Sequence, residues 1–368
     1  MEFSFTAEQD QFRDVLGRFM RDKSPASAVR SLMETDKGFD AEVWQQLCAE
    51  QGLAGIHLPE DCGGTGYGPV ELAIIMEEQG RALLCSPFMA SAVMAGYAIL
   101  QTGTDDQKRA LLPGIADGST IATLAITEQS GLWRDDDIQL QATKSGDDYV
   151  LSGTKRFVVD GQNADLLVVA GRTDAGVSLF TVNAGSEGVT CRVANAMDPT
   201  RKLAEIDFSS APAQLLGVEG GVDLAAIFNA VLIAFANEMV GGAQAMLDSA
   251  IEYAKLRVQF GREIGSFQGL KHRFSDLMVD IELAKATAYQ AAQHLADGKD
   301  ATAFASMAKA TASEVFRHAA HECIQFHGGI GFTWENDTHL WFKRAKSSEV
   351  FLGTPNDHRE RMLQAMGI

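Results

Sequence analysis

Residues 228–239 read FNAVLIAFANEM, and their apolar side chains recur at spacings of three and four. This spacing places Phe228, Val231 and Phe235 on one face of a helix. The stretch lies within residues 213–354, a segment that is rich in alanine and contains no proline. A proline-free segment of this length predicts several long helices that pack against one another.

Upstream of this segment, short runs rich in Val, Thr, Leu and Phe alternate with Gly, Asp and Asn. Three such runs are TIATLAIT (120–127), ADLLVVAGRT (164–173) and VSLFTVNA (177–184). This pattern is typical of antiparallel strands in a small barrel or sandwich. In the first part of the chain the apolar residues again recur at helical spacing, as in AEQDQFRDVLGRFM (7–20).

The sequence therefore predicts an α+β chain of three domains. We expect an N-terminal α-helical domain over residues 1–116, a middle antiparallel β-barrel domain over 117–215, and a C-terminal four-helix bundle over 216–368. The chain of 368 residues is long enough for this organisation.

Composition excludes several classes of protein. The net charge of −18 argues against a nucleic-acid surface, because binding phosphates requires clustered cations. The sequence contains no run of 18 or more apolar residues, so it does not predict a membrane span. The N-terminus, MEFSFTAEQDQF, lacks the basic start and apolar core of a signal peptide, so we expect a cytoplasmic protein. The five cysteines show no CxxC pair and are expected to be buried thiols, with no disulfide framework and no metal site.

Three segments carry the strongest motifs. They are RVQFGREIGSFQGLKHRFSDL (257–277), QFHGGIGFTWE (325–335), and LAITE (124–128) followed by GTKRFVVDG (153–161). In this order, and on a helix–strand–helix layout, they resemble the acyl-CoA dehydrogenase family over nearly the whole chain.

The resemblance implies an oxidation of the Cα–Cβ bond of an acyl-CoA thioester. In that family a carboxylate removes the α proton while N5 of FAD accepts the β hydride, and an electron-transfer flavoprotein is the expected electron acceptor. Family members form dimers that pack into tetramers. Each FAD lies across a subunit interface, where one subunit holds the flavin ring and its neighbour grips the ADP half.

The residues expected to grip the ADP half are all present. By the resemblance, Arg257 pairs with the pyrophosphate, which suits the paired hydrogen bonds of a guanidinium. Phe260 packs on the cofactor. Gln325 and the backbone of Gly328 and Gly329 contact the adenosine end, where glycine permits close approach. The alternative for these residues is helix-end packing and a simple turn.

The half of the site expected to hold the flavin ring departs from the family pattern. Where the family shows small residues after Thr-Glu, this chain reads TEQSGLWRDDD, with Leu132, Trp133 and the acidic run Asp135–Asp137. These residues add bulk and negative charge where a cofactor is expected, and like charges repel. The alternative is a surface loop with a solvated acidic run.

A second departure lies in GTKRFVVDG. The family's tryptophan is replaced by Phe157 and its threonine by Val159, which cannot donate a hydrogen bond. Thr127 is kept, and we expect it to contact the cofactor.

The catalytic base is absent from both positions that the resemblance suggests. These positions hold Leu352 and Val231, and neither side chain accepts a proton. Nearby carboxylates that could substitute are Glu349, Glu238 and Glu335.

The flavin-ring half and the base are lost, whereas the ADP-gripping half is kept. This contrast predicts a subunit that lacks a catalytic base and donates the ADP-gripping half of an FAD site to a second acyl-CoA dehydrogenase chain. The resemblance is to the non-catalytic chain of an α2β2 tetramer, and it suggests steroid side-chain or fatty acid catabolism. Two alternatives remain. One is a complete homotetrameric dehydrogenase with an atypical base, and the other is a flavin-free scaffold that binds CoA esters.

Overall fold

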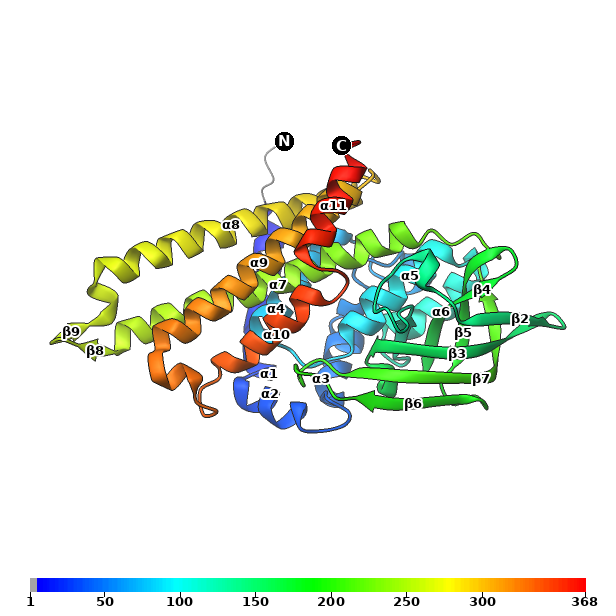
Figure 1. Cartoon of the computed structure of the whole chain (residues 1–368), viewed down its shortest axis with the longest axis horizontal. Coiled ribbons are helices and arrows are strands. Elements are labelled where there is room, and N and C mark those ends of the chain that lie inside the picture. The colour runs from blue at the N-terminus through cyan, green and yellow to red at the C-terminus, as the bar shows by residue number, and fades with distance from the viewer. Residues whose placement is uncertain (1–4) are drawn as a thin grey trace. The chain divides into compact units, whose positions relative to one another are not determined.

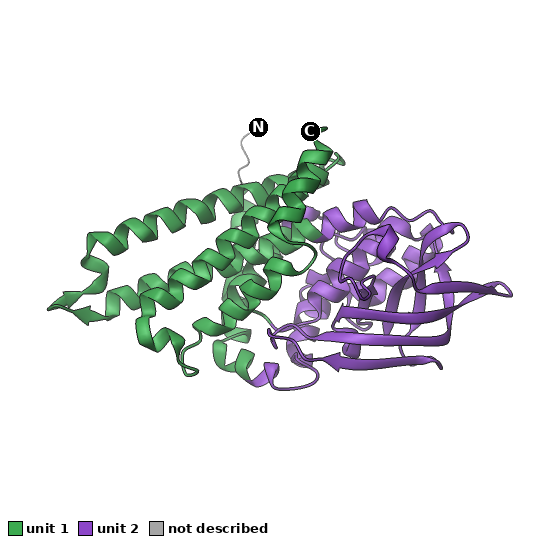
Figure 2. Cartoon of the chain, viewed as in Figure 1, with its two compact units in different colours: residues 1–30, 72–84, 232–368 green, residues 31–71, 85–231 purple. Residues whose placement is uncertain are grey.

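The computed structural model describes residues 5–368, and the chain divides into two units (Figure 2). Unit 1 is mainly helical, whereas unit 2 combines a sheet with helices. Unit 1 comprises residues 1–30, 72–84 and 232–368, and unit 2 comprises residues 31–71 and 85–231. The first four residues of the N-terminal stretch, on which the cytoplasmic expectation partly depends, lie outside the described residues.

Long helices dominate unit 1. Helix α9 (Thr302–His327) packs against α8 (Gln268–Ala296), α10 (Thr338–Val350) and α11 (Pro355–Ala365) (Figure 1). The other elements with residues in this unit are α1 (Ala7–Lys23), α2 (Ala26–Met33), α4 (Pro69–Ala82), α7 (Leu224–Leu256), the hairpin strands β8 (Val258–Gln259) and β9 (Arg262–Glu263), and the 3-10 turns η7 (Ile264–Ser266) and η8 (Gly328–Phe332).

Local sequence fixes where several of these helices begin. Helix α1 starts with a capping box in which Thr6 and Gln9 each bond to the other's backbone N–H. Helix α11 starts in the same way with Thr354 and Asp357, and Pro355 occupies its first turn.

Close contact between α4 and α7 depends on two glycines. A Cβ atom at Gly80 would lie 1.9 Å from the Glu238 carbonyl oxygen, and one at Gly241 would lie 1.8 Å from the Glu77 carbonyl oxygen. No side chain fits at these distances, so glycine allows the two backbones to touch.

In unit 2, five strands close into a barrel. Strand β4 pairs with β2, β2 with β3, β3 with β7, β7 with β5, and β5 with β4 again, while β1 and β6 attach to β4 and β7. The strands are β1 (Ala122–Ala125), β2 (Gln141–Ser145), β3 (Asp148–Val159), β4 (Leu166–Thr173), β5 (Gly176–Asn183), β6 (Val189–Ala194) and β7 (Leu203–Leu216). Buried side chains such as Leu151, Phe180 and Ile206 form its core.

Helical elements make up the rest of unit 2. They are α3 (Ala41–Gln45), α5 (Gly96–Thr102), α6 (Asp105–Ala116), the π-helices η1 (Gln46–Glu50) and η4 (Met89–Ala95), and the 3-10 turns η2 (Leu53–Gly55), η3 (Glu60–Cys62), η5 (Asp135–Asp137) and η6 (Gly161–Asn163).

The predicted order of helices, strands and helices is confirmed, with two corrections. The sheet is mixed, because β1 and β2 both pair with β4 in parallel. Cys191 on the edge strand β6 is exposed, whereas the other four cysteines are buried thiols as expected.

By length and composition alone, helix α7 could cross a membrane. The sequence analysis predicted no such segment. Of its most apolar window, 78% is buried inside the structure. A buried core helix passes the same test, so this finding is weak evidence for a span.

Candidate functional site

The Arg257 hairpin projects two of the predicted cofactor residues from the end of α7. Arg257 follows the helix directly, and its carbonyl accepts a hydrogen bond from the Ile264 backbone N–H at 2.8 Å. Its exposed side chain makes no ion pair within the described residues. Phe260 lies at the hairpin tip, where it is 93% exposed and has a φ of +53°. A cation and an aromatic ring therefore stand open on this surface.

The remaining predicted residues of the ADP-gripping half lie at the end of α9. Gln325 is exposed in its last turn, and the Gly328 N–H caps the helix by donating to the Gln325 carbonyl. Gly328 has a φ of +63°, which favours glycine. A Cβ atom at Gly328 or Gly329 would meet no other atom within 4 Å. The chain itself therefore leaves room for a ligand to approach this backbone.

The two groups belong to one surface of unit 1. The ring of Tyr253, one turn before Arg257, stacks on the ring of His327 with centroids 4.3 Å apart. His327 itself lies between Gln325 and Gly328 in sequence. This stack joins the hairpin to the glycine turn, so the structure brings all five predicted ADP-half residues to one region.

Thr127 lies in unit 2 just after β1, where it is buried. Its hydroxyl donates to the Arg156 carbonyl, and the Arg156 N–H donates to the Thr127 carbonyl at 2.8 Å. The hydroxyl proton is thus engaged within the chain, although the oxygen can still accept a hydrogen bond.

The loop after Glu128 is anchored at its base and filled by aromatic packing. Trp133 lies against Phe228, with ring centroids 5.3 Å apart. Across the loop, a Cβ atom on Gly131 would lie 3.6 Å from the ring of Phe157, which has a φ of +55°. Trp133, which stands where the resemblance expects a small residue, therefore packs within unit 2.

A buried ion pair anchors this loop. The Lys155 ammonium donates to a Glu128 carboxylate oxygen at 2.7 Å and to the Ile126 carbonyl at 2.9 Å. The same Glu128 oxygen accepts from the backbone N–H groups of Gln139 and Leu140, both at 3.0 Å. Burial lowers the pKa of Lys155 to about 8, against the opposing effect of Glu128.

The positions expected for a catalytic base are buried and apolar. Leu352 is 4% exposed and Val231 is fully buried. Leu352 has a φ of +63°, a conformation that is costly for leucine. The imidazole of His358 donates to the Leu352 carbonyl at 2.8 Å and helps to hold this turn.

Neighbouring carboxylates are engaged elsewhere. Glu238 forms a buried ion pair with Arg344 at 2.6 Å. Glu349 pairs with Arg317 at 3.0 Å and with Lys346. Glu335 is exposed and forms no ion pair within the described residues. A general base must be free to take a proton, so the two paired carboxylates are poor substitutes.

The sequence analysis missed a buried lysine beside Leu352. The ammonium of Lys309 donates to the Ser313 hydroxyl at 3.0 Å and to the carbonyls of Ser348 and Gly353, both at 3.1 Å. Burial lowers its pKa to about 7, and burial also lowers the pKa of His358 to about 4. Alanine, serine and methionine surround Lys309 in ASMAKATAS (305–313), and a lysine inside such a run signals a buried charge.

Comparison with known proteins gives consistent matches. Residues 6–119 match the family profile "Acyl-CoA dehydrogenase, N-terminal domain", and residues 224–367 match "Acyl-CoA dehydrogenase, C-terminal domain". The chain is 35% identical to the acyl-CoA dehydrogenase IpdE2 of Mycobacterium tuberculosis, over 96% of each protein.

Two solved structures resemble the fold over its whole length. One is a variant of the Tcur3481-Tcur3483 steroid ACAD, with 30% identity, coverage of 98% of both chains and a TM-score of 0.89. The other is the ChsE4-ChsE5 complex from Mycobacterium tuberculosis, with 26% identity, coverage of 100% of this chain and 99% of that one, and a TM-score of 0.90.

Proposed function

Because the chain belongs to the acyl-CoA dehydrogenase family, whose members are FAD-dependent oxidoreductases, we propose that it is the subunit of a heteromeric enzyme that lacks the catalytic base. It donates Arg257, Phe260, Gln325 and the Gly328–Gly329 backbone to an FAD whose ring a second family chain holds. The FAD supplies the hydride acceptor. The observation that carries the proposal is the contrast between an open ADP-gripping surface and base positions that are buried and apolar.

The ADP-gripping surface fits its role as a donor site. The Arg257 side chain forms no ion pair within the described residues, and the Phe260 ring is 93% exposed, so both side chains are open to a ligand. The open space above Gly328 and Gly329 leaves their backbone accessible to a polar group. These features support binding of a pyrophosphate and an adenosine supplied from outside this chain.

The base positions support a loss of proton abstraction in this chain. Leu352 and Val231 are apolar, and Glu238 and Glu349 are held in ion pairs. Moving Glu238 away from Arg344 would leave two unpaired charges in a buried site, which costs several kcal/mol. The α proton of a thioester would therefore be taken by a carboxylate of the partner chain.

The loop after Glu128 supports a lost flavin-ring site. Trp133 packs on Phe228, and Phe157 stands where the resemblance expects a tryptophan. Val159 is fully buried and offers no hydrogen bond. Thr127 is kept, although its hydroxyl donates a hydrogen bond to the Arg156 backbone carbonyl.

The relatives suggest the substrate class. One solved relative is named a steroid acyl-CoA dehydrogenase, and another is a complex of two named chains. We therefore propose an acyl-CoA ester from steroid breakdown as the substrate of the assembled enzyme, with an electron-transfer flavoprotein as the acceptor. Cytoplasmic location is part of the same proposal.

The decisive experiment is the flavin-to-protein ratio of the chain purified alone and with a family chain encoded beside it. We expect little flavin on the chain alone and two FAD per four chains in the complex. Yellow homotetramers with one flavin per chain and turnover of acyl-CoA would establish the homomeric alternative instead. A colourless complex would favour the flavin-free scaffold.

A variant pair tests the donated arginine. Arg257→Ala removes a charge-assisted contact, so the complex should bind FAD about 10- to 100-fold more weakly. Lys255→Ala, an exposed cation close by on the last turn of α7, is the matched control and should leave FAD affinity unchanged. Equal FAD affinity in the wild type and the Arg257→Ala complex would contradict the donation of Arg257.

A further inference from the structure

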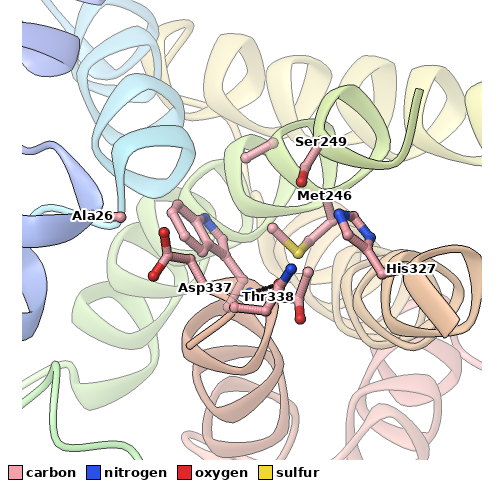
Figure 3. A pocket seen from close by; sticks show the side chains of 9 residues that line it. Ala26, Met246, Ser249, His327, Asp337 and Thr338 are labelled. Atoms are coloured by element: carbon pink, nitrogen blue, oxygen red, sulfur yellow. Dashed lines mark hydrogen bonds between the residues drawn. The ribbon is translucent and has the colours of Figure 1, made fainter. Parts of the chain in front are cut away.

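A pocket of about 270 Å³ in unit 1 is continuous with the ADP-gripping surface (Figure 3). His327, which lies in its wall, directly precedes Gly328. Thr338, another wall residue, donates from its hydroxyl to the Gly331 carbonyl at 3.0 Å. The pocket therefore shares residues with the glycine turn and is not a separate site. An independent surface lies in unit 2, at the edge of the sheet.

Strand β6 forms an open edge of this sheet. It pairs with β7 alone and is the outermost strand in Figure 1. Strand β1, at another edge, is covered, because it packs on η4 and its Ala122 N–H donates to the Ser91 hydroxyl of that helix at 3.0 Å. Proline, a bulge or a free charge commonly protects an open edge. Strand β6 (VTCRVA) has no proline and no bulge, and its single charged residue, Arg192, is paired with Glu205 at 2.7 Å.

The hydrogen-bond register shows which backbone groups of β6 face this edge. Opposite residues of an antiparallel pair alternate between hydrogen-bonded and non-hydrogen-bonded pairs. The Ser209 N–H donates to the Gly188 carbonyl at 2.8 Å, and this pair is in register with the whole ladder between β6 and β7. The even-numbered residues of β6 therefore bond to β7. The N–H and C=O groups of its odd-numbered residues point away from β7, and these residues are Val189, Cys191 and Val193.

Most of these outward groups have no partner in the chain. The Val189 N–H donates to the Ser186 carbonyl at 3.2 Å. Within the described residues, the Val189 carbonyl and both backbone groups of Cys191 and Val193 make no hydrogen bond. The edge therefore offers donors and acceptors to an added strand.

The apolar side chains of β6 also lack cover. Val193 is 44% exposed and Cys191 is exposed. Ala204 and Ile206, which lie opposite them on β7 and share their face of the sheet, are fully buried. An added strand that continues this face would cover the side chains at the edge.

The residue pattern of β6 is complementary to itself about Cys191. Antiparallel pairing of two copies about this residue places Cys191 opposite Cys191, Val189 opposite Val193, and Thr190 opposite Arg192. All the outward-facing residues then bond across the contact. Apolar side chains meet apolar ones on one face, and each Arg192 meets a threonine on the other, so like charges do not oppose each other.

We propose that β6 is a contact surface for a second copy of this chain, whose own β6 adds antiparallel about Cys191 and continues the sheet. A single short strand buries little surface, so by itself the contact gives a weak association that depends on concentration. It involves neither the flavin nor the thioester and is independent of the proposed function.

Thiol cross-linking tests the contact on the full chain, in whichever assembly it purifies. The other four cysteines are buried, so a short bismaleimide should join two copies through Cys191, and Cys191→Ser should remove the covalent dimer. Deuterium exchange gives a second measurement. The amides of Cys191 and Val193 should exchange at least about tenfold more slowly at high protein concentration than at low concentration.

A variant pair at one position makes the test specific. Val193→Pro removes an outward N–H without breaking a bond to β7, and it should lower the yield of covalent dimer at least about fivefold. Val193→Thr keeps the N–H and the branched shape, so the yield should stay the same. Both variants retain Cys191.

Three outcomes would overturn the contact. They are no covalent dimer of the wild type, equal yields from Val193→Pro and Val193→Thr, and a cross-link to a different chain in place of a second copy. Each of them leaves the flavin-to-protein ratio of the complex unaffected.

Discussion

Acid should destabilise this protein through His57, a histidine buried in unit 2 with its ring centroid 4.6 Å from that of Tyr97. Burial lowers the pKa of His57 to about 4, against an opposing hydrogen bond with the Ala92 backbone. The unfolded chain has a His57 pKa near 6.5. The folded pKa is depressed, so the stability contributed by neutral His57 is complete above pH 6.5 and is lost as the pH falls towards 4.

The magnitude follows from these two values. At pH 5 the unfolded imidazole is almost fully protonated, whereas the folded one is still mostly neutral. Linkage then gives a loss of about 2 kcal/mol between pH 7.5 and pH 5, rising to about 3.4 kcal/mol below pH 4. His57→Phe keeps an aromatic ring of similar size and has no proton to bind, so this part of the acid sensitivity should disappear.

Urea unfolding at pH 7.5 and pH 5 checks the prediction. The drop in unfolding free energy between the two pH values should be about 2 kcal/mol smaller for His57→Phe than for the wild type. Carboxylates and other histidines titrate in both proteins, so their effects cancel in this comparison. An identical drop in both proteins would refute the burial argument for His57.

Two further predictions concern buried charges in unit 1. Arg344→Met leaves Glu238 buried without its cation and should cost about 3–5 kcal/mol in urea unfolding, whereas the double variant with Glu238→Gln should recover much of that loss; equal stability of the two would contradict a buried pair. Lys309→Met removes the donor to Ser348 and Gly353 and should cost about 1–3 kcal/mol at pH 7. The folded pKa of Lys309 is depressed to about 7. The wild type should therefore gain stability relative to the variant as the pH rises from 7 to 10, and a parallel pH profile would argue against this depressed pKa.

The sequence predicts the classes of element well because they depend on local periodicity. The spacing of Phe228, Val231 and Phe235 places them on one side of α7, and the Val- and Thr-rich runs become strands. Strand pairing depends on contacts between distant residues, so the parallel pairing of β1 with β4 was not predicted. Exposure of Cys191 was missed for the same reason, because β6 lies at a sheet edge.

The candidate site was predicted unevenly. Motifs located Arg257, Phe260 and the glycine turn because these residues stand close together in sequence and their types are distinctive. The stack of Tyr253 on His327, which joins the two groups, has no sequence signal. Lys309 was missed because its partners, the carbonyls at the end of α10, come from backbone that any residue type supplies.

The backbone path of the turn at Leu352 is set by contacts that do not involve the Leu352 side chain. A left-handed leucine costs roughly 1–2 kcal/mol and persists only where its surroundings impose it. Here His358 holds the Leu352 carbonyl and Lys309 holds the Gly353 carbonyl, so the backbone path does not depend on the side chain at position 352. An apolar residue can therefore occupy this position while the turn keeps its shape. Arg257 and the glycine turn at Gly328 lie on other elements of unit 1, so the residue type at position 352 does not determine their conformation.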